Sequence, residues 1–460
     1  MSEIGTTEPP AYEPLGFRTA LTDTPLKWRR VVTWAMYDWG TQPYNTIIIT
    51  FVFAVYLTSA PFGDVNYTTR ALAIATTISG LLIAVLAPVL GQSSDRSGRT
   101  VTVLRVLTAL MVVLSAALYF VKPDPAYLVM GLVLFGIGSL VNEIAGVTYN
   151  ATIDQVASTR SVGRVSGFGW GMGYVGGIVS LLLIYFAFIH PDVGLFGVTG
   201  RDGLDIRVSM LVCAVWTVIF TIPPLVMLKN QPPAINDGAH PGILGAYVQL
   251  WRTLVKLWRT DRPLITFLIA SAVFRDGLAG VFSFGAIIAA GTFGFSAGDV
   301  IIFGAAANIT AGVSTMLFGF LDDRIGARRV ILISLASLSV LSMLVFFLHD
   351  GGKTVFWIVG LGLTIFVGPA QSASRSYLAR LIPEGKSGEV FGLYATTGRA
   401  ISFLSPLFFA VAVTIGARVN HNENAQYWGI LGIALILVAG FIVMLRVKAP
   451  APEHEAPIAR

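Results

Sequence analysis

The chain contains almost no cysteine and no pattern of metal ligands. Its single cysteine, Cys213, lies inside an apolar run, so neither an internal disulfide nor a cluster of thiolates can form. The five histidines are scattered through the expected tails and loops, without the spacing of a metal site. These absences exclude a disulfide scaffold and a zinc or iron–sulfur centre, and we expect no metal and no cofactor.

Signatures of catalysis are also missing. The chain has no His-Glu-x-x-His, no Gly-x-Ser-x-Gly and no Walker phosphate-loop phrase. A membrane-embedded enzyme would need a metal cluster, a nucleophile with its base or a phosphate loop, and an ATP-driven pump would need the last of these. We therefore predict that the protein is not an enzyme.

Charged residues are scarce. Asp, Glu, Lys and Arg make up 12% of the 460 residues and hydrophobic residues make up 55%, whereas roughly a quarter of the residues in soluble domains are charged. The composition therefore predicts a protein of the lipid bilayer. In such a protein the net charge of +6 reports orientation, and we expect no nucleic-acid partner.

Apolar runs long enough to cross a bilayer, about 20 residues, recur along the chain. Twelve such runs occupy residues 31–59, 69–90, 100–121, 126–149, 164–189, 207–228, 263–290, 299–320, 329–348, 354–374, 389–415 and 426–446. In the longest polar interval, Trp251–Arg259 is basic and amphipathic enough to lie along a membrane surface. The expected domains are a tail (1–30), a six-helix bundle (31–228), a linker (229–262), a second six-helix bundle (263–446) and a tail (447–460).

Lysine and arginine fall mainly on one side of these runs. Of the 31 basic residues, 23 lie in the two tails and in the loops that follow even-numbered runs, and six lie in the opposite loops. The other two, Arg275 and Arg399, lie near the middle of runs. Because basic residues favour the cytoplasmic side, both termini are predicted to be cytoplasmic.

One charged phrase occurs twice, about half the chain apart, each time between two apolar runs. The copies are Gly91-Gln-Ser-Ser-Asp95-Arg96-Ser-Gly98-Arg99 and Gly319-Phe-Leu-Asp-Asp323-Arg324-Ile-Gly326. A weaker echo pairs Gly163-Arg-Val-Ser-Gly167 with Gly388-Glu-Val-Phe-Gly392 at a similar offset. Duplicated halves in a membrane protein are typical of transporters, whose halves surround a shared site.

The repeated phrase on six plus six runs resembles the signature of the major facilitator superfamily. Further phrases resemble the autophagy-related vacuole effluxer branch and its bacterial relatives: Tyr37-Asp38-Trp39, Tyr44-Asn45-Thr46, Tyr149-Asn150-Ala151, Gly163–Trp170, Asp276-Gly277, Gln371–Ser376 and Phe391–Tyr394. The resemblance implies an all-α fold of twelve transmembrane helices in two pseudo-symmetric six-helix halves. It also implies secondary transport, with amino-acid efflux attributed to eukaryotic members. Pro43 departs from the family wording and should kink the first helix.

Charges inside apolar runs are costly in hydrocarbon and normally face the interior of the bundle. They are Asp38, Glu143, Asp276 and the two arginines already named. We expect Asp276 and Arg399 to form a switchable pair, in which Arg399 holds either Asp276 or an anionic group of the cargo. Arg275 points about 100° away from Asp276 on a helix, so it snorkels or pairs elsewhere. The alternative is that these charges form permanent ion pairs without a role in transport.

Uncharged polar residues complete the candidate binding set. They are Tyr37, Asn45, Asn142, Gln371 and Tyr394. Asn150 is a further amide of the same kind. These side chains could bind a polar cargo, although buried amides also hold membrane helices together.

The two charged phrases are assigned to gating. The carboxylates of Asp95 and Asp323 can accept hydrogen bonds from arginine or cap a helix N-terminus. Gly98 and Gly326 allow a tight turn, and Arg96, Arg99 and Arg324 complete the set. The resemblance implies that this cluster closes the cytoplasmic side when the protein opens outward. The alternative is a plain solvated turn that carries positive-inside charge.

These observations favour a monomeric secondary transporter of a small polar solute, with amino acids or related zwitterions preferred by resemblance. Proton coupling through Asp38, Glu143 or Asp276 is a hypothesis, because a carboxylic acid in a low-dielectric cavity can bind a proton near neutral pH unless an arginine keeps it ionised. The alternatives are an uncoupled facilitator, an exporter of sugars, organic anions or drug-like solutes, and a sensor that transports nothing. The expected location is the cell membrane of a bacterium or a vacuolar or lysosomal-type membrane of a eukaryote.

Overall fold

The computed structural model describes residue 21 and residues 26–231, 262–382, 385–420 and 425–447. Most of both expected tails and the amphipathic stretch Trp251–Arg259 lie outside the described residues. The described chain is helical throughout its two halves. The fold class predicted from the sequence is therefore confirmed: a broken first segment is followed by eleven helical segments of the described chain that are long and apolar enough to cross a membrane, in the order expected.

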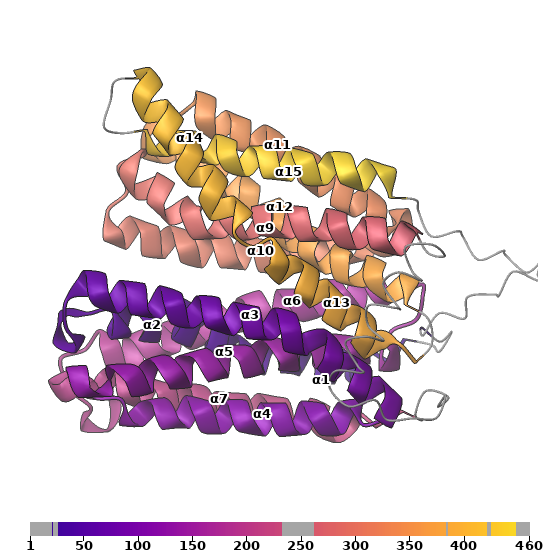
Figure 1. The fold of residues 1–460 in the computed structure, drawn as a ribbon, viewed down its shortest axis with the longest axis horizontal. Coiled ribbons are helices and arrows are strands. Elements are labelled where there is room, and N and C mark those ends of the chain that lie inside the picture. The colour runs from indigo at the N-terminus through magenta and orange to yellow at the C-terminus, as the bar shows by residue number, and fades with distance from the viewer. Residues whose placement is uncertain (1–20, 22–25, 232–261, 383–384, 421–424, 448–460) are drawn as a thin grey trace, which may run out of the picture.

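The N-terminal half (indigo to magenta in Figure 1) contains the first six segments. They are a broken first segment of α1 (Trp28–Pro43), η1 (Tyr44–Phe51) and α2 (Phe53–Leu57), followed by α3 (Val65–Ser97), α4 (Thr100–Ala117), α5 (Leu128–Asn150), α6 (Val162–Ile184) and α7 (Leu204–Met227). A short 3₁₀ turn, η5 (Ala151–Gln155), links α5 to the loop before α6.

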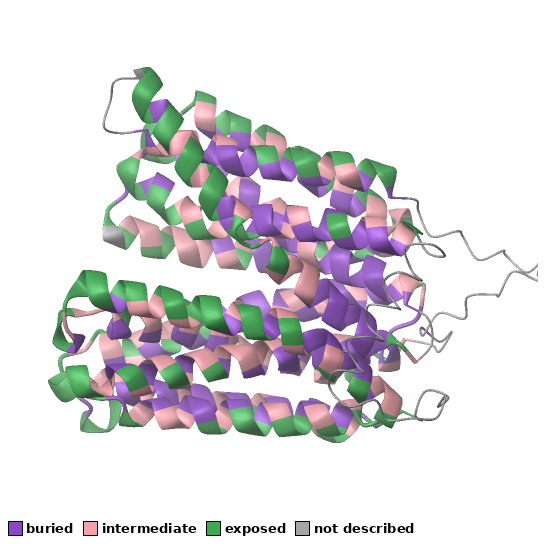
Figure 2. Cartoon of the chain, viewed as in Figure 1, coloured by how far each residue is buried: buried purple, intermediate pink, exposed green. Residues whose placement is uncertain are grey.

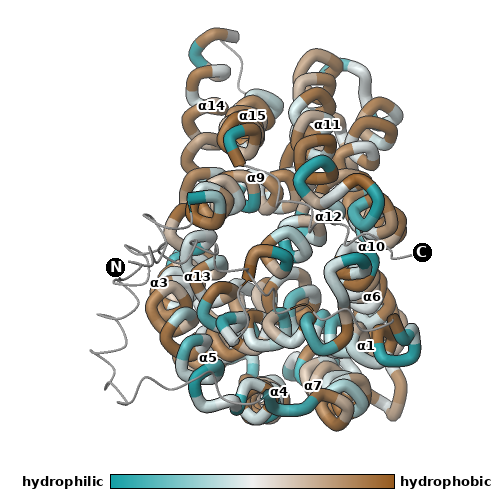
Figure 3. The backbone as a smooth tube through the Cα atoms, turned by 90° about the vertical axis from the view of Figure 1, so that its right-hand side faces the viewer, coloured by the Kyte–Doolittle hydropathy of each residue, from teal (hydrophilic) through white to brown (hydrophobic). Residues whose placement is uncertain are grey.

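The C-terminal half (salmon to yellow in Figure 1) repeats this plan. Its segments are α9 (Arg262–Gly291), α10 (Ala297–Ile325), α11 (Ala327–Phe347), α12 (Gly352–Leu381), α13 (Ser387–Ala400) with α14 (Leu404–Asn420), and α15 (Gly429–Arg446). Apart from the broken first segment, eleven helical segments of the described chain are long and apolar enough to cross a bilayer. Viewed along the helices, hydrophobic stretches lie on all sides of the bundle (Figure 3).

Pro43 ends the first straight helix, as the sequence predicts. A proline has no N–H to donate and its ring crowds the preceding turn. After Pro43 the chain continues as a π-helical stretch, η1, and the α-helix α2 follows. The helical geometry therefore changes at the stretch that contains Asn45, one of the candidate binding residues.

The eleventh segment is broken between α13 and α14, and Asp276 on α9 stabilises the break. The carboxylate of Asp276 accepts from the backbone N–H of Ser405 at 2.7 Å, and the Ser405 hydroxyl donates to the Asp276 carbonyl at 2.7 Å. Ser405 lies in the first turn of α14, so the carboxylate satisfies a donor that the break would leave without a partner.

The two halves touch at one end of the bundle. We call the end where α1 begins and α15 ends the closed end, and the opposite end the open end. Buried residues gather at the closed end (Figure 2). There α3 packs on α13, with the Thr396 hydroxyl donating to the Ala84 carbonyl at 3.0 Å. Nearer the open end, Thr77 and Leu81 on this face of α3 are exposed, so the halves separate.

Candidate functional site

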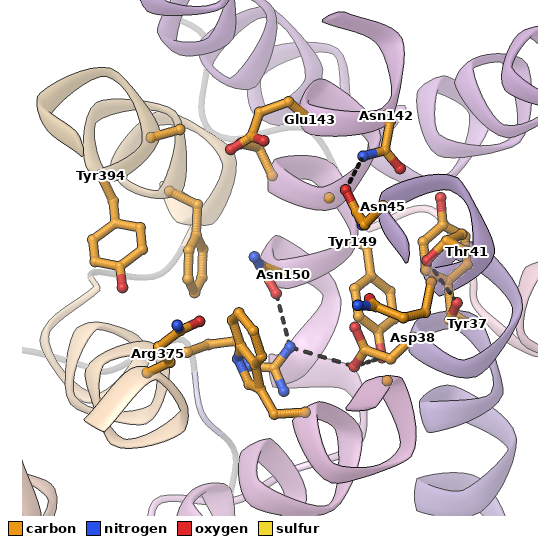
Figure 4. Close-up of a pocket in the computed structure, with 18 of the residues that line it drawn as sticks. Tyr37, Asp38, Thr41, Asn45, Asn142, Glu143, Tyr149, Asn150, Arg375 and Tyr394 are labelled. Carbon is orange, nitrogen blue, oxygen red and sulfur yellow. Dashed lines mark hydrogen bonds and ion pairs between the residues drawn. The ribbon is translucent and has the colours of Figure 1, made fainter. Parts of the chain in front are cut away.

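A cavity of about 350 Å³ lies between the two halves and receives side chains from both (Figure 4). Its wall is polar and aromatic at a depth where the helices are otherwise apolar. The residues that line it are Tyr37, Asp38, Thr41, Gln42, Asn45, Asn142, Glu143, Gly146, Val147, Tyr149, Asn150, Trp170, Gly173, Tyr174, Arg275, Gln371, Arg375, Phe391, Tyr394 and Ala395.

The buried side of the cavity is formed by Asp38 of α1 and Arg375 of α12. A guanidinium nitrogen of Arg375 lies 3.5 Å from the Asp38 carboxylate, and the Tyr149 hydroxyl donates to the same oxygen at 3.0 Å (Figure 4). The Arg375 side chain is only 3% exposed. This is an ion pair between the halves, in which Arg375 is buried and Asp38 is 23% exposed.

Arg375 is held almost entirely by the opposite half. Its guanidinium donates to the Asn150 side-chain oxygen at 2.9 Å, to the Ser166 hydroxyl at 2.9 Å and to the Ser166 carbonyl at 2.7 Å. Because a buried guanidinium without acceptors is costly, separating the halves here requires new partners for these donors. Because Arg375 both lines the cavity and holds the halves together, a change in its contacts alters the cavity and the contact between the halves at once.

Aromatic packing fixes the position of Asp38. The Tyr149 ring stacks between Trp34 and Tyr37, with ring centroids 4.5 and 4.4 Å away. A Cβ added at Gly169 of α6 would lie 2.6 Å from an Asp38 carboxylate oxygen, so only glycine leaves room for the pair. The stack and the glycine together hold the Asp38 carboxylate against Arg375.

A second ion pair between the halves lies on the more exposed side of the cavity. Arg399 of α13 donates to the Glu143 carboxylate of α5 at 2.7 Å, and both side chains are about one-third exposed. The expected pair of Asp276 with Arg399 is therefore wrong. Asp276 is held by Ser405 at the helix break, and Glu143 occupies Arg399 instead.

Arg275 of α9 is the third arginine at this depth, and its direct contacts in the described chain are with carbonyl oxygens and an aromatic ring. Its Nε donates to the Ser271 carbonyl at 3.3 Å, and one terminal nitrogen donates to the Tyr394 carbonyl at 2.5 Å. The guanidinium carbon lies 3.5 Å from the centroid of the Tyr394 ring. No ion pair among the described residues includes Arg275.

The uncharged candidates divide into wall residues and packing residues. The Asn142 amide donates to the Asn45 side-chain oxygen at 3.0 Å across the cavity wall (Figure 4). The Tyr37 hydroxyl bonds Thr108 of α4 at 2.9 Å, so its polar atom is used in packing against that helix. The Tyr394 hydroxyl shares a hydrogen bond with Ser374 at 2.7 Å. Gln371 also lines the cavity.

The cavity thus brings together all the predicted binding residues except Asp276 and Arg399, and Arg399 reaches it through Glu143. Sequence reasoning missed Arg375 as a site residue. Its predicted span ended at residue 374, whereas α12 continues to Leu381, so this charge was counted in a loop. Its place in the phrase Gln371–Ser376 was the available signal.

At the closed end, Asp323 caps the N-terminus of α6. Its carboxylate accepts from the backbone N–H groups of Gly163 at 2.8 Å and Arg164 at 3.2 Å, and from Arg164 Nε at 2.6 Å. Arg380 pairs with Asp322 at 2.6 Å and with Asp323 at 3.4 Å. We call this set the α6–α10 contact.

Asp95 makes the pseudo-symmetric contact. Its carboxylate accepts from the backbone N–H groups of Gly388 at 3.0 Å and Glu389 at 2.8 Å, at the N-terminus of α13. The Gln92 amide donates to the Glu389 carboxylate at 3.2 Å. We call Asp95, Gln92, Gly388 and Glu389 the α3–α13 contact. Here, among the described residues, Asp95 and Glu389 form no ion pair with an arginine or lysine.

The remaining gating candidates form the turns beside these contacts. Gly98 and Gly326 adopt positive φ angles of 63° and 88°, as the predicted tight turns require. Within the described chain, Arg96, Arg99 and Arg324 make no ion pair with the opposite half. Their gating role stays a prediction. The described residues also contain no group of three or more metal-ligating side chains.

Comparisons with known proteins agree with this architecture. The family described as "Vacuole effluxer Atg22 like" matches residues 59–456. The chain is 23% identical over 421 residues to the uncharacterized MFS-type transporter YxiO of Bacillus subtilis, which covers 90% of this chain and 93% of that protein.

A second relative and one solved structure extend the comparison. Autophagy-related protein 22 of Yarrowia lipolytica is 25% identical over 330 residues, covering 66% of this chain and 53% of that protein, so the chain spans about half its length. The fold is similar to that of the MFS proton:xylose symporter XylE, with a TM-score of 0.70, 13% identity, and coverage of 92% of this chain and 96% of that chain.

Proposed function

The chain belongs to the vacuole effluxer Atg22-like family of the major facilitator superfamily, and from this premise we propose that it moves a small polar solute across a membrane by alternating access. It is a multi-pass integral membrane protein and a transporter of that superfamily. We propose amino acids and related zwitterions as the cargo, and the cytoplasm as the location of the closed end.

One observation carries this proposal. The cavity lies between two duplicated halves, its charges come from both of them, and one end of the bundle is held shut by contacts that differ from those of the cavity. When two halves rock about a shared site, one end of the bundle closes while the other opens. Duplicated transporters move a solute in this way. Its volume lies in the range of small-molecule sites, roughly 300–1,000 Å³.

The cargo class follows from the wall of the cavity. Side chains of both signs and several amides line it, together with the aromatic rings of Trp170 and Tyr174. A sugar needs hydrogen bonds but no charges, whereas an amino acid needs a cation and an acceptor within the same small space. The charged wall therefore supports an ionic or zwitterionic cargo over a neutral one.

Proton coupling is the second part of the proposal. Asp38 and Glu143 each form an ion pair between the halves, so protonation of either would weaken that pair. Asp276 is held by backbone and hydroxyl groups at a helix break, which supports a structural role for it. Asp38 and Glu143 are thus the proposed coupling residues.

The experiment has two stages. Purified protein is first screened by thermal unfolding against amino acids, short peptides, sugars, nucleosides and organic anions, because a ligand at about 100 times its Kd stabilises the fold by about 2.7 kcal/mol. The compound that raises the melting temperature is then offered to proteoliposomes with and without an imposed pH gradient. We expect amino acids to bind and the gradient to drive their accumulation in the wild type.

The coupling residues are tested in the same vesicles. Glu143→Gln should keep exchange of labelled cargo across the membrane but lose accumulation driven by the pH gradient. A wild type that binds only sugars or nucleosides would refute the cargo class. Accumulation by both Glu143→Gln and Asp38→Asn that still follows the gradient would refute the coupling scheme.

A further inference from the structure

The three arginines around the cavity are not equivalent. Arg375 and Arg399 each pair with a carboxylate of the opposite half, whereas the direct contacts of Arg275 within the described chain are with two carbonyl oxygens and the ring of Tyr394. A guanidinium carries five N–H donors, and only two donations by Arg275 have acceptors in the described part of the chain. Donors of a permanent cation are therefore available at the cavity wall.

The ion pairing around the cavity points the same way. Asp38 and Glu143 pair with Arg375 and Arg399, and the third carboxylate at this depth, Asp276, is held by Ser405. Arg275 lines the cavity and belongs to no ion pair of the described residues. A cation outside an ion pair is costly at membrane depth. Trp170, which also lines the cavity, has an indole N–H without an acceptor among the described residues. The cavity thus offers hydrogen-bond donors and a guanidinium that belongs to no ion pair of the described residues, which are the groups that bind an anion.

Neighbouring residues fix the position of the Arg275 guanidinium. Its plane lies over Tyr394, and the carbonyl of Tyr394 accepts one of its N–H groups. A Cβ added at Gly398 would lie 2.3 Å from a terminal nitrogen of Arg275, so glycine is needed for the guanidinium to lie there. Such a fixed planar fork matches the two oxygens of a carboxylate.

We propose that Arg275 is the anchor for a carboxylate group of the cargo, and that the protein selects solutes carrying that group. This inference rests on the proposed function, since it assigns a chemical class to the same cavity. It makes the carboxylate obligatory and leaves the amine optional, because both carboxylates of the cavity already have arginine partners. An α-hydroxy acid should therefore bind as an amino acid does, and an amino-acid amide should not.

The test compares three pools of compounds on the purified full-length protein in lipid nanodiscs. The pools are the proteinogenic amino acids, the amides of the same amino acids, and α-hydroxy acids of matched skeleton. We expect the two acid pools to raise the melting temperature and the amide pool to leave it unchanged. A shift with the amide pool as large as that with the acids would overturn the proposal.

Variants then locate the anchor. Arg275→Gln should raise the Kd of the acid found in the pools by about tenfold or more, because a bidentate charge-assisted pair is lost. Arg275→Lys should retain the preference for acids with weaker binding, and Gly398→Ala should weaken binding without a change of charge. Arg418→Gln, an exposed arginine of α14, is the matched control and should bind like the wild type. Unchanged acid binding by Arg275→Gln would refute the anchor.

The two proposals fail in different ways. If an acid binds through Arg275 but is never exchanged across proteoliposomes, transport fails and the anchor stands. If a compound without a carboxylate binds and is transported equally by wild type and Arg275→Gln, transport stands and the anchor is refuted. If Arg275→Gln does not fold, the anchor is still tested by comparing the binding of acids and amides to the wild type and to Gly398→Ala.

Discussion

The α6–α10 contact and the α3–α13 contact share a backbone geometry and differ in charge. In both, an aspartate of the repeated phrase accepts from two successive backbone N–H groups at a helix N-terminus of the opposite half. Asp323 also pairs with Arg164 and Arg380. Asp95 instead lies beside Glu389, whose carboxylate accepts from the Gln92 amide and forms no ion pair within the described chain.

This difference shows that different residues determine the position of each contact and its strength. The repeated phrase specifies where the carboxylate meets the helix, because a helix N-terminus attracts a negative charge wherever it is presented. The residue after the first helix glycine, Arg164 in one half and Glu389 in the other, specifies how strongly the contact is held. We infer that the α6–α10 contact is the stronger of the two, and that the α3–α13 contact is the first to separate.

The largest effect is expected from breaking the charged contact. Arg380→Gln leaves the carboxylates of Asp322 and Asp323, which are 2% and 3% exposed, short of a counter-charge. Removing one partner of a buried pair costs about 3–5 kcal/mol. Thermal unfolding in nanodiscs should show a large drop in melting temperature. A variant as stable as the wild type would contradict the assigned strength of this contact.

A steric change tests the weaker contact. A Cβ at Gly91 would lie 2.1 Å from the Gly388 carbonyl oxygen, whereas one at Gly80 on the same helix meets nothing within 4 Å. Gly91→Ala should destabilise the closed end by about 1–3 kcal/mol, the usual cost of overpacking. Gly80→Ala is the control and should leave the melting temperature unchanged. Equal behaviour of the two variants would mean that the helices do not touch at Gly91.

Charge exchange at the symmetric position should make the two contacts alike. Glu389→Arg places a cation where Arg164 stands in the other half, next to the Asp95 carboxylate. We expect a gain of up to about 1 kcal/mol, reduced by salt because the Asp95 end of the pair is only half-buried. Transport should slow if opening of the closed end limits the rate. The measurement is the melting temperature at low and high salt, and a loss of stability would contradict the comparison.

The smallest effect is expected from Asp95→Asn. An asparagine oxygen can still accept one of the two backbone N–H groups, and loss of the charge removes the repulsion from Glu389. The net change should be below about 1 kcal/mol, whereas Asp323→Asn loses two arginine partners and should cost more. Melting temperatures of the two variants measure the difference directly. Equal losses would show that arginine neighbours add nothing.

The sequence predicts the helices and most of the cavity for a simple physical reason. Apolar runs of bilayer length and charges inside them have few explanations, so Asp38, Glu143, Arg275 and Arg399 could be expected to face the interior of the bundle. The pairing of these charges could not be predicted. It depends on helix rotation and on the break between α13 and α14, which brings Ser405 to Asp276.

Arg375 was missed for a related reason. Hydropathy ends a span where polar residues begin, but a helix continues if its polar end is covered by protein. Here Ser166 and Asn150 of the opposite half cover it. Long-range contacts of this kind are set by the fold and leave no local pattern in the chain.

The central claim is that the protein alternates between two states around the charged cavity. In one state the closed end is shut, and in the other the open end is shut. In a Cys213→Ser background, paired spin labels are placed at Ser97 and Arg329 of the closed end, or at Val65 and Ile415 of the open end, all exposed. The account predicts that Arg380→Gln lengthens the closed-end distance and shortens the open-end distance. If both distances stay unchanged, or both lengthen together, the halves do not rock about the cavity and the account is contradicted.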